Sequence, residues 1–439
     1  MSDAPHPFTI PNFRRFWAAR FASMLAQNAL MLIVGWQAYN LAREDLGVAA
    51  SAGILGLLGL LQFVPLFILT PLVGWIADRL DRRWIARAVF AVQAVMASVL
   101  AILTYQELIS LQIIYGVAVL LGICRAFAGP ALSALAPNLV PAGSLPRAIA
   151  LSTIAWQVGV IVGPGFAGPL YSVAPSLPYT VCAVLYFVAL GAMLLIGPVP
   201  RSSIDRTRGP FQQVADGLRY VGTNKLVLGA ITLDLLVMML AGAQAMIPVF
   251  ARDILNAGEA GLSLLAASPA VGAVLTALWF SYKPMNSSVG TKMLIAMAIF
   301  GAGTVGFGLS QHLALSMAFL ALCGSADMFG VYIRQSLIQL HTPDDKRGRV
   351  GAVSQVTISA SNELGDAFTG ALAFYLGPVI AIVAGGAGAI VITGIWSRLF
   401  PQLAKAKTFD PPDAVIKSEP TAQAAAGKPS ENTHKESAR

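Results

Sequence analysis

The first candidates for chemistry are five of the ionisable residues inside long apolar stretches: Arg125, Asp234, Asp327, Glu363 and Asp366. A charge at the centre of a bilayer costs about 2.5–3.5 kcal/mol on insertion scales, so each is expected to have a partner or a water-filled cavity. Glu363 and Asp366 are three residues apart and would share one face of a helix. Since two acids so close are not both expected to ionise in a low-dielectric medium, this pair is a candidate for binding and releasing a proton.

The same acids permit a purely structural role. Each could pair with a basic residue on a neighbouring helix and only hold the helices together. The sequence leaves both roles open for Glu363, Asp366 and Asp234. Asp327 could instead be solvated in the outer half of its span.

Twelve apolar runs would position these residues, and each is long enough to cross about 30 Å of hydrocarbon as a helix rising about 1.5 Å per residue. The runs fall roughly at residues 16–41, 50–77, 84–105, 109–136, 148–171, 177–197, 226–251, 261–281, 292–310, 314–337, 350–374 and 377–400. They predict an all-α membrane protein with twelve transmembrane helices in two six-helix halves, 16–197 and 226–400. The remaining segments are predicted to be a cytoplasmic N-terminus at 1–15, a central cytoplasmic loop at 198–225 and a disordered cytoplasmic tail at 401–439.

Composition supports a membrane protein. Of the 439 residues 56% are hydrophobic and 11% charged, and the mean hydropathy is +0.70, which a bilayer accommodates and a water-soluble domain does not. The net charge of +8 does not indicate a nucleic-acid partner, because the basic residues sit in short loops between apolar runs. Three cysteines stand singly, so we expect no metal site and no cofactor.

The distribution of basic residues predicts the orientation. Twelve spans place both termini on one side, and the loops on that side hold nearly all the Lys and Arg. The opposite loops hold only Arg43 and Arg252, each beside an acid. This asymmetry predicts a multi-pass protein of the bacterial inner membrane with both termini in the cytoplasm.

The two halves repeat each other's patterns. Three pairs of short motifs recur in chain order at nearly equal spacing: Ala42-Arg43-Glu44 with Ala251-Arg252-Asp253, Pro65 and Trp75 with Pro269 and Trp279, and Gly163–Gly168 with Gly365–Gly370. Three matches in register indicate pseudo-symmetric halves rather than chance.

A charged cluster begins near the end of the second run with Gly74 and continues through Asp78, Arg79, Arg82 and Arg83 before the third run. It could simply be an interfacial loop with its arginines against lipid headgroups. The spacing of the glycine and the aspartate resembles, however, the signature loop between helices 2 and 3 of Major Facilitator Superfamily transporters, with Asp81 at the position of a second glycine. The resemblance implies a conformational latch, in which Asp78 contacts the N-terminus of the eleventh helix when the cytoplasmic side is closed. Such a contact would contribute about 0.3–2 kcal/mol.

Further motifs extend the resemblance over about residues 11–400. Leu121-x-x-x-Arg125-x-x-x-Gly129 is similar to the second signature of the superfamily, and we expect Arg125 to act in proton coupling. Gly159-x-x-x-Gly163-Pro164-x-x-Ala167-Gly168 is similar to the antiporter signature of proton-coupled exporters, with Ala167 and Ala150 in place of glycines. The stretches 339–349 and 362–367 resemble the exporter branch that contains the bacterial enterobactin exporter and drug–proton antiporters.

Polar side chains within the spans are candidates for the lining of a substrate cavity: Asn28, Gln37, Gln62, Gln157 and Gln244. Ordinary hydrogen bonds between helices are the alternative for these residues. Gly159, Gly163, Pro164 and Gly168 are expected to pack helices closely.

Together these features predict a secondary active transporter that exports a small amphipathic molecule, drug-like or siderophore-like, in exchange for protons. A proton-linked importer of a small metabolite is the alternative, because the antiporter motif is incomplete. A membrane-embedded enzyme or receptor would need a catalytic pair or a large soluble domain, and neither is visible, so we expect no enzymatic activity. The expected partners are the lipid bilayer, the substrate and protons, and the expected state is a monomer.

Overall fold

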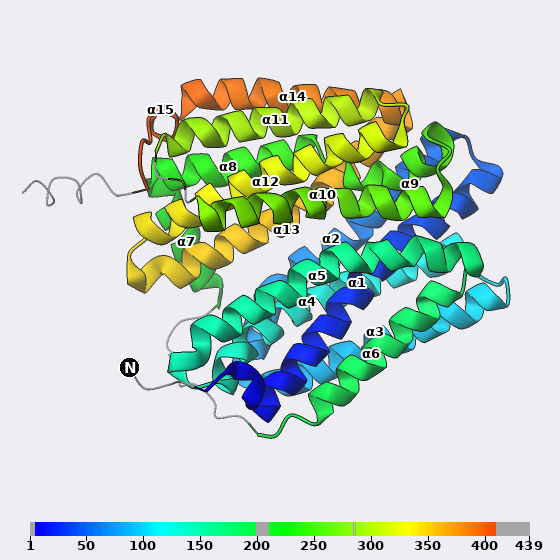
Figure 1. Cartoon of the computed structure of the whole chain (residues 1–439), viewed down its shortest axis with the longest axis horizontal. Coiled ribbons are helices and arrows are strands. Elements are labelled where there is room, and N and C mark those ends of the chain that lie inside the picture. Colours follow the sequence, from blue (N-terminus) through cyan, green and yellow to red (C-terminus); the bar gives the residue numbers. More distant parts are fainter. Residues whose placement is uncertain (1–4, 199–209, 284, 286, 410–439) are drawn as a thin grey trace, which may run out of the picture.

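The computed structural model describes residues 5–198, 210–283, 285 and 287–409, and within these residues it contains helices and no strand. The predicted all-α fold is confirmed. The described chain forms two groups of long helices, which lie one above the other in Figure 1.

Among the described residues, the N-terminal half contains six long helices: α1 (Pro11–Asp45), α2 (Val48–Arg79), α3 (Arg82–Tyr105), α4 (Leu111–Leu135), α5 (Leu145–Val173) and α6 (Leu177–Leu194). The C-terminal half contains six more: α8 (Lys225–Leu240), α10 (Gly258–Tyr282), α11 (Val289–Leu309), α12 (Leu313–His341), α13 (Asp344–Leu376) and α14 (Pro378–Leu399). The short elements are η1 (Pro7–Thr9), η2 (Ala136–Leu139), η3 (Ala142–Ser144), α7 (Pro210–Thr223), η4 (Gln244–Met246), α9 (Ile247–Val249), η5 (Phe250–Ile254) and α15 (Pro401–Ala404).

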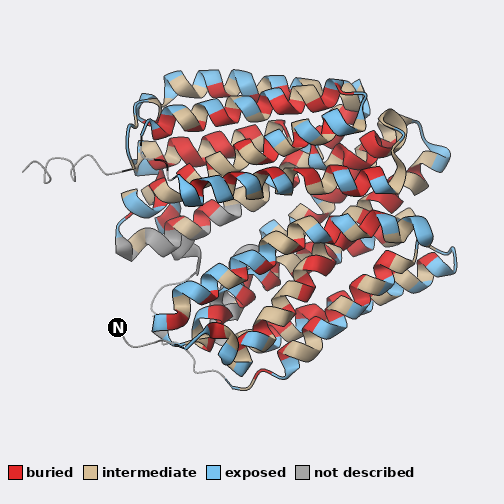
Figure 2. Ribbon diagram, in the orientation of Figure 1, coloured by how far each residue is buried: buried red, intermediate tan, exposed pale blue. Residues whose placement is uncertain are grey.

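Eleven helical segments of the described chain are long and apolar enough to cross a membrane. The described part of α13 is not among them; it carries Asn362, Glu363 and Asp366, which lower its hydropathy. Large apolar side chains such as Val95, Leu275 and Val391 are exposed on the outside of the bundle. Figure 2 shows the buried residues on the inward sides of the helices, and the apolar outer surface fits contact with lipid.

The long helices alternate between two ends of the molecule. We call the end that carries η1 and α15 the terminal face; it is on the left in Figure 1. The other end, the opposite face, carries the short turns at residues 46–47, 106–110 and 255–257.

Two segments differ from the sequence-based expectation. The seventh run, 226–251, is not one helix: α8 ends at Leu240, and the chain continues through η4 and α9 into the π-helical η5. Pro248 lacks an N–H group and is suited to a helix start rather than a helix interior, which favours the interruption. The central loop contains the helix α7, whose Val221 is buried against Val227 and Ile338. Its 14 residues are too few for a span and too polar to stand out as an apolar run.

Candidate functional site

Glycines bring α2 and α13 into close contact across the boundary between the halves. A Cβ atom added at Gly56 would lie 2.7 Å from the Cα atom of Gly370, and one added at Gly59 would lie 3.0 Å from the Cβ atom of Asp366. Only glycine permits so close an approach of two backbones. This contact positions the acidic turn of α13 against the N-terminal half.

Glu363 forms an ion pair with Arg125 of α4, so the pair connects the two halves. Glu363 is only 2% exposed, and its Oε2 atom has no hydrogen-bond partner among the described residues. Asp366 lies one turn further along α13 and is half-buried, with the backbone N–H of Ala245 directed toward it. Three of the five ionisable residues singled out from the sequence therefore meet at one place, with one positive and two acidic groups.

A second buried ion pair lies within the C-terminal half and joins Asp234 of α8 to Arg334 of α12. Both residues are nearly inaccessible, with 3% and 2% of their surfaces exposed. Asp327, half-buried on α12, lies within electrostatic range of both. The sequence analysis did not single out Arg334. The signal was present, because Arg334 is an arginine inside the predicted tenth span, as Arg125 is inside the fourth.

The predicted latch is described only in part. The side chains of Gly74, Asp78 and Arg79 lie outside the described residues. Arg83 pairs with Asp81 at the start of α3 and also donates to the carbonyl oxygen of Ile196, which ties α3 to the end of α6. Arg82 is half-buried beside it.

The glycines and the proline of the antiporter-like motif contact two different helices. Gly159 and Gly163 face α1, where added Cβ atoms would lie 2.6 Å from Met24 and 2.8 Å from the carbonyl oxygen of Leu25. Pro164 and Gly168 face α10 of the other half. The hydroxyl of Ser263 donates to the carbonyl oxygen of Pro164 at 2.6 Å and accepts from the N–H of Gly168 at 2.8 Å.

The predicted cavity residues occupy different environments. Gln37 is buried inside the N-terminal half, where it accepts from the Tyr179 hydroxyl at 2.6 Å and donates to Thr104 at 3.3 Å. The amide of Asn28 donates to the carbonyl oxygen of Met24 in its own helix. The remaining three residues differ in exposure: Gln62 is buried, Gln157 is half-buried and Gln244 is exposed beside the break after α8.

Polar bonds also join the halves at the opposite face. Arg43 of α1 pairs with Asp253 of η5 at 3.0 Å, and the Tyr39 hydroxyl donates to the same carboxylate. Arg252 donates to the side-chain oxygen of Asn40 at 2.6 Å. The motif repeated after the first and seventh runs therefore forms a set of bonds between the halves, which the sequence analysis did not foresee.

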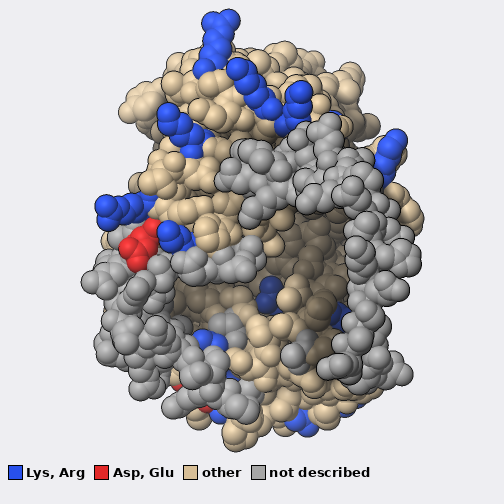
Figure 3. Space-filling view, turned by 90° about the vertical axis from the view of Figure 1, so that its left-hand side faces the viewer, with Lys and Arg blue, Asp and Glu red and all other residues tan. Residues whose placement is uncertain are grey.

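The terminal face is hollowed between the two halves. Figure 3 shows this hollow in a space-filling view, with Lys and Arg side chains deep inside it. The glycine contacts of α2 with α13, the Ser263 bonds and the Arg43–Asp253 pair all join the halves between the acidic turn of α13 and the opposite face. The structure is thus open toward the terminal face and closed toward the opposite face.

Two relatives match this chain over most of their length. The chain is 26% identical over 389 residues to the enterobactin exporter EntS of Shigella boydii serotype 18, covering 88% of this chain and 90% of that protein. It is 25% identical over 390 residues to EntS of Escherichia coli O6:K15:H31, again covering 88% and 90%.

Two solved structures show the same fold. A bacterial homolog of the human lysosomal transporter Spinster, in an inward-facing and occupied conformation, matches with a TM-score of 0.70 at 15% identity, covering 91% of this chain and 98% of that one. A D-xylose–proton symporter matches with a TM-score of 0.66 at 13% identity, covering 92% and 100%.

The model of the family described as "Major Facilitator Superfamily" matches residues 16–365 of this chain. That range includes the acidic turn of α13 up to Gly365, the Arg125–Glu363 pair and most of both halves. With this match and the shared fold, the chain belongs to the Major Facilitator Superfamily of membrane transporters.

Proposed function

We propose that this protein is a secondary active exporter of a small amphipathic molecule, drug-like or siderophore-like, which works by proton antiport with alternating access. The observation that carries the proposal is the Arg125–Glu363 ion pair, because it crosses the boundary between the halves beside a second acid, Asp366. A group that binds a proton at this boundary can link protonation to the relative movement of the halves.

The coupling follows from the charges at this place. Protonation of Glu363 removes its negative charge and weakens the attraction that holds Arg125 to α13. Arg125 is then free to pair with Asp366 or with an acceptor on the substrate. The change is energetically large, since breaking a buried ion pair by loss of one partner costs about 3–5 kcal/mol.

The direction of transport and the orientation of the protein in the membrane are part of the proposal. Two relatives that are similar over most of the chain are named enterobactin exporters, and this supports export. The basic residues on the side of the termini support a cytoplasmic terminal face in the bacterial inner membrane, so that the hollow would receive its molecule from the cytoplasm. A reporter fused after Lys225 should then report cytoplasm, and one at Asn256 the outside.

The experiment compares two transport modes in proteoliposomes, using a cationic amphipathic dye as the probe. Neutralising the proton carrier, in Glu363→Gln or Asp366→Asn, should abolish export driven by a pH gradient but keep exchange of dye for dye. Exchange completes the cycle without releasing a proton from an empty carrier. Asp45→Asn, which neutralises an exposed acid at the opposite face, is the matched control and should keep both modes.

The contrary results are distinct. If both acid variants export dye at wild-type rates under a pH gradient, proton antiport through Glu363 and Asp366 is wrong. Uptake of the dye driven by proton entry would favour the importer alternative. Equal loss of protein yield and of both modes would assign the acids a structural role.

A further inference from the structure

A pocket of about 470 Å³ lies at the opposite face between the two halves. Its walls include Trp36, Asn40 and Glu44 from α1 and Arg252 and Glu259 from η5 and α10. The volume is within the range of about 300–1,000 Å³ that is typical of small-molecule sites. The pocket is separate from the Arg125–Glu363 pair and from the hollow of the terminal face.

The pocket contains a buried hydrogen-bond donor with no acceptor. Trp36 is 2% exposed, and its Nε1–H group has no hydrogen-bond partner among the residues that the structure describes. A buried indole N–H normally finds an acceptor, because leaving it unsatisfied costs free energy. Trp36 lines the pocket, but its N–H group lies beneath the pocket surface, so a bound molecule can supply the acceptor only if the ring turns toward it.

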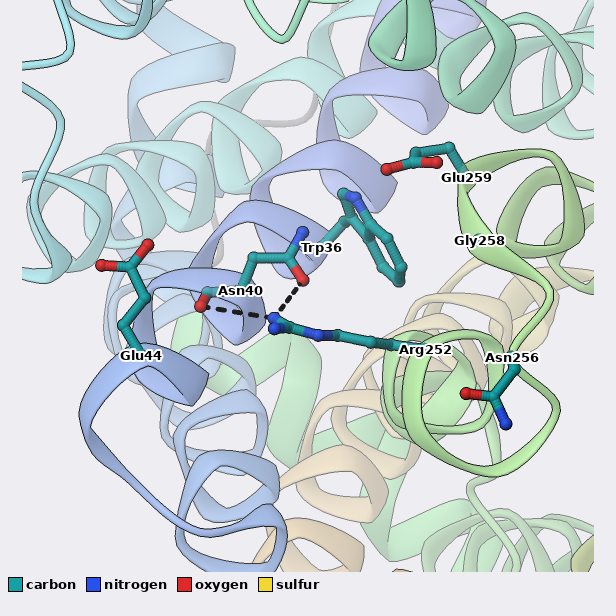
Figure 4. Close-up of a pocket in the computed structure, with 7 residues that line it drawn as sticks. All are labelled: Trp36, Asn40, Glu44, Arg252, Asn256, Gly258 and Glu259. Atoms are coloured by element: carbon teal, nitrogen blue, oxygen red, sulfur yellow. Dashed lines mark hydrogen bonds between the residues drawn. The ribbon is translucent and has the colours of Figure 1, made fainter.

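The charges around Trp36 define what such a molecule must carry. In Figure 4, Arg252 and Trp36 extend into the pocket between Glu44 and Glu259, which lie on either side of them. Arg252 donates through its Nη1 atom to Asn40, and its other nitrogens donate no hydrogen bond to a described residue, so they are available to an anionic group. The two carboxylates have no basic partner among the described ion pairs and can accept from an ammonium group.

We propose that this pocket is a binding site for a small zwitterion, whose anionic group contacts Arg252 and the Trp36 N–H and whose ammonium group contacts Glu259 or Glu44. The site exists only while the halves are joined at the opposite face, because its walls come from both. Its occupant therefore stabilises the conformation that is closed there. Under the proposed function, an external zwitterion would slow export by holding the carrier in this state.

Thermal unfolding of the full-length purified protein tests binding without any transport assay. The probes are glycine, β-alanine, γ-aminobutyrate and 6-aminohexanoate, a series in which the distance between the two charges increases. Butyrate and butylamine are the single-charge controls. At least one zwitterion should raise the unfolding midpoint saturably, and each single-charge compound should need at least a tenfold higher concentration for the same shift.

Two variants locate the site. Trp36→Phe keeps an aromatic ring and removes the N–H, and Glu259→Gln removes one carboxylate; each should weaken the probe at least tenfold. Trp156→Phe, at an exposed tryptophan of α5, is the matched control and should bind as the wild type does. If Trp36→Phe does not fold, Glu259→Gln decides.

The proposal is overturned if no member of the series produces a saturable shift, if butyrate or butylamine acts as strongly as the zwitterions, or if both variants bind with unchanged affinity. If the zwitterion binds but the protein shows no gradient-driven export, the proposed function is wrong and the proposed binding site is not.

Discussion

The backbone N–H of Gly168 donates a hydrogen bond of 2.8 Å to the hydroxyl of Ser263, and this bond joins the N-terminal half to the C-terminal half. Gly168 lies so close to α10 that an added Cβ atom would overlap the carbonyl oxygen of Glu259. The last glycine of the antiporter-like motif is therefore at the contact that closes the opposite face.

We expect Gly168→Ala to open this contact. The methyl group would displace α10 and break both hydrogen bonds by which Ser263 joins α10 to Pro164 and Gly168 of α5. A cysteine placed at the opposite face should then react with an impermeant thiol reagent at least several-fold faster. Gly165→Ala is the matched control, because an added Cβ atom at Gly165 has no atom within 4 Å. Equal reactivity of the two variants would show that the Gly168 contact does not control closure.

The Asp234–Arg334 pair should behave as a structural unit of the C-terminal half. Arg334→Leu leaves the Asp234 carboxylate buried without its partner, and we expect a loss of about 3–5 kcal/mol of stability, measured as a lower midpoint of thermal unfolding in detergent. The double variant with Asp234→Leu should recover most of that loss, because no unpaired charge remains. Arg398→Leu, at an exposed arginine, is the control. A double variant as unstable as the single one would contradict an ion-pair role.

The latch at Asp78 leads to a third prediction. If Asp78 holds the N-terminus of α13 when the terminal face is closed, Asp78→Asn should fold normally but turn over more slowly. The lost contact, about 0.3–2 kcal/mol, shifts the population toward the state that is open at the terminal face, by up to roughly thirtyfold. Labelling of a cysteine in the hollow from the terminal side should increase, whereas Asp45→Asn should leave it unchanged. Wild-type labelling together with wild-type transport in Asp78→Asn would reduce the loop to a topology signal.

The amino-acid sequence by itself was sufficient to predict the helical fold, the two halves and the superfamily. Apolar runs of membrane length can be satisfied in lipid only as helices, and this constraint is local to each run. The sequence also indicated Glu363 and Asp366 as candidates for proton binding, because an acid inside an apolar run is costly wherever the run lies.

The partners of these acids depended on tertiary structure. Arg125 and Glu363 are 238 residues apart, and only the contact of α2 with α13 brings their helices together. Gln37 is a second example. Its polarity in the sequence was compatible with either a cavity lining or a hydrogen bond between helices, and in the structure it accepts a hydrogen bond from Tyr179 of α6. The pocket around Trp36 was likewise invisible in the sequence, because its walls come from helices of both halves and exist only where those halves meet.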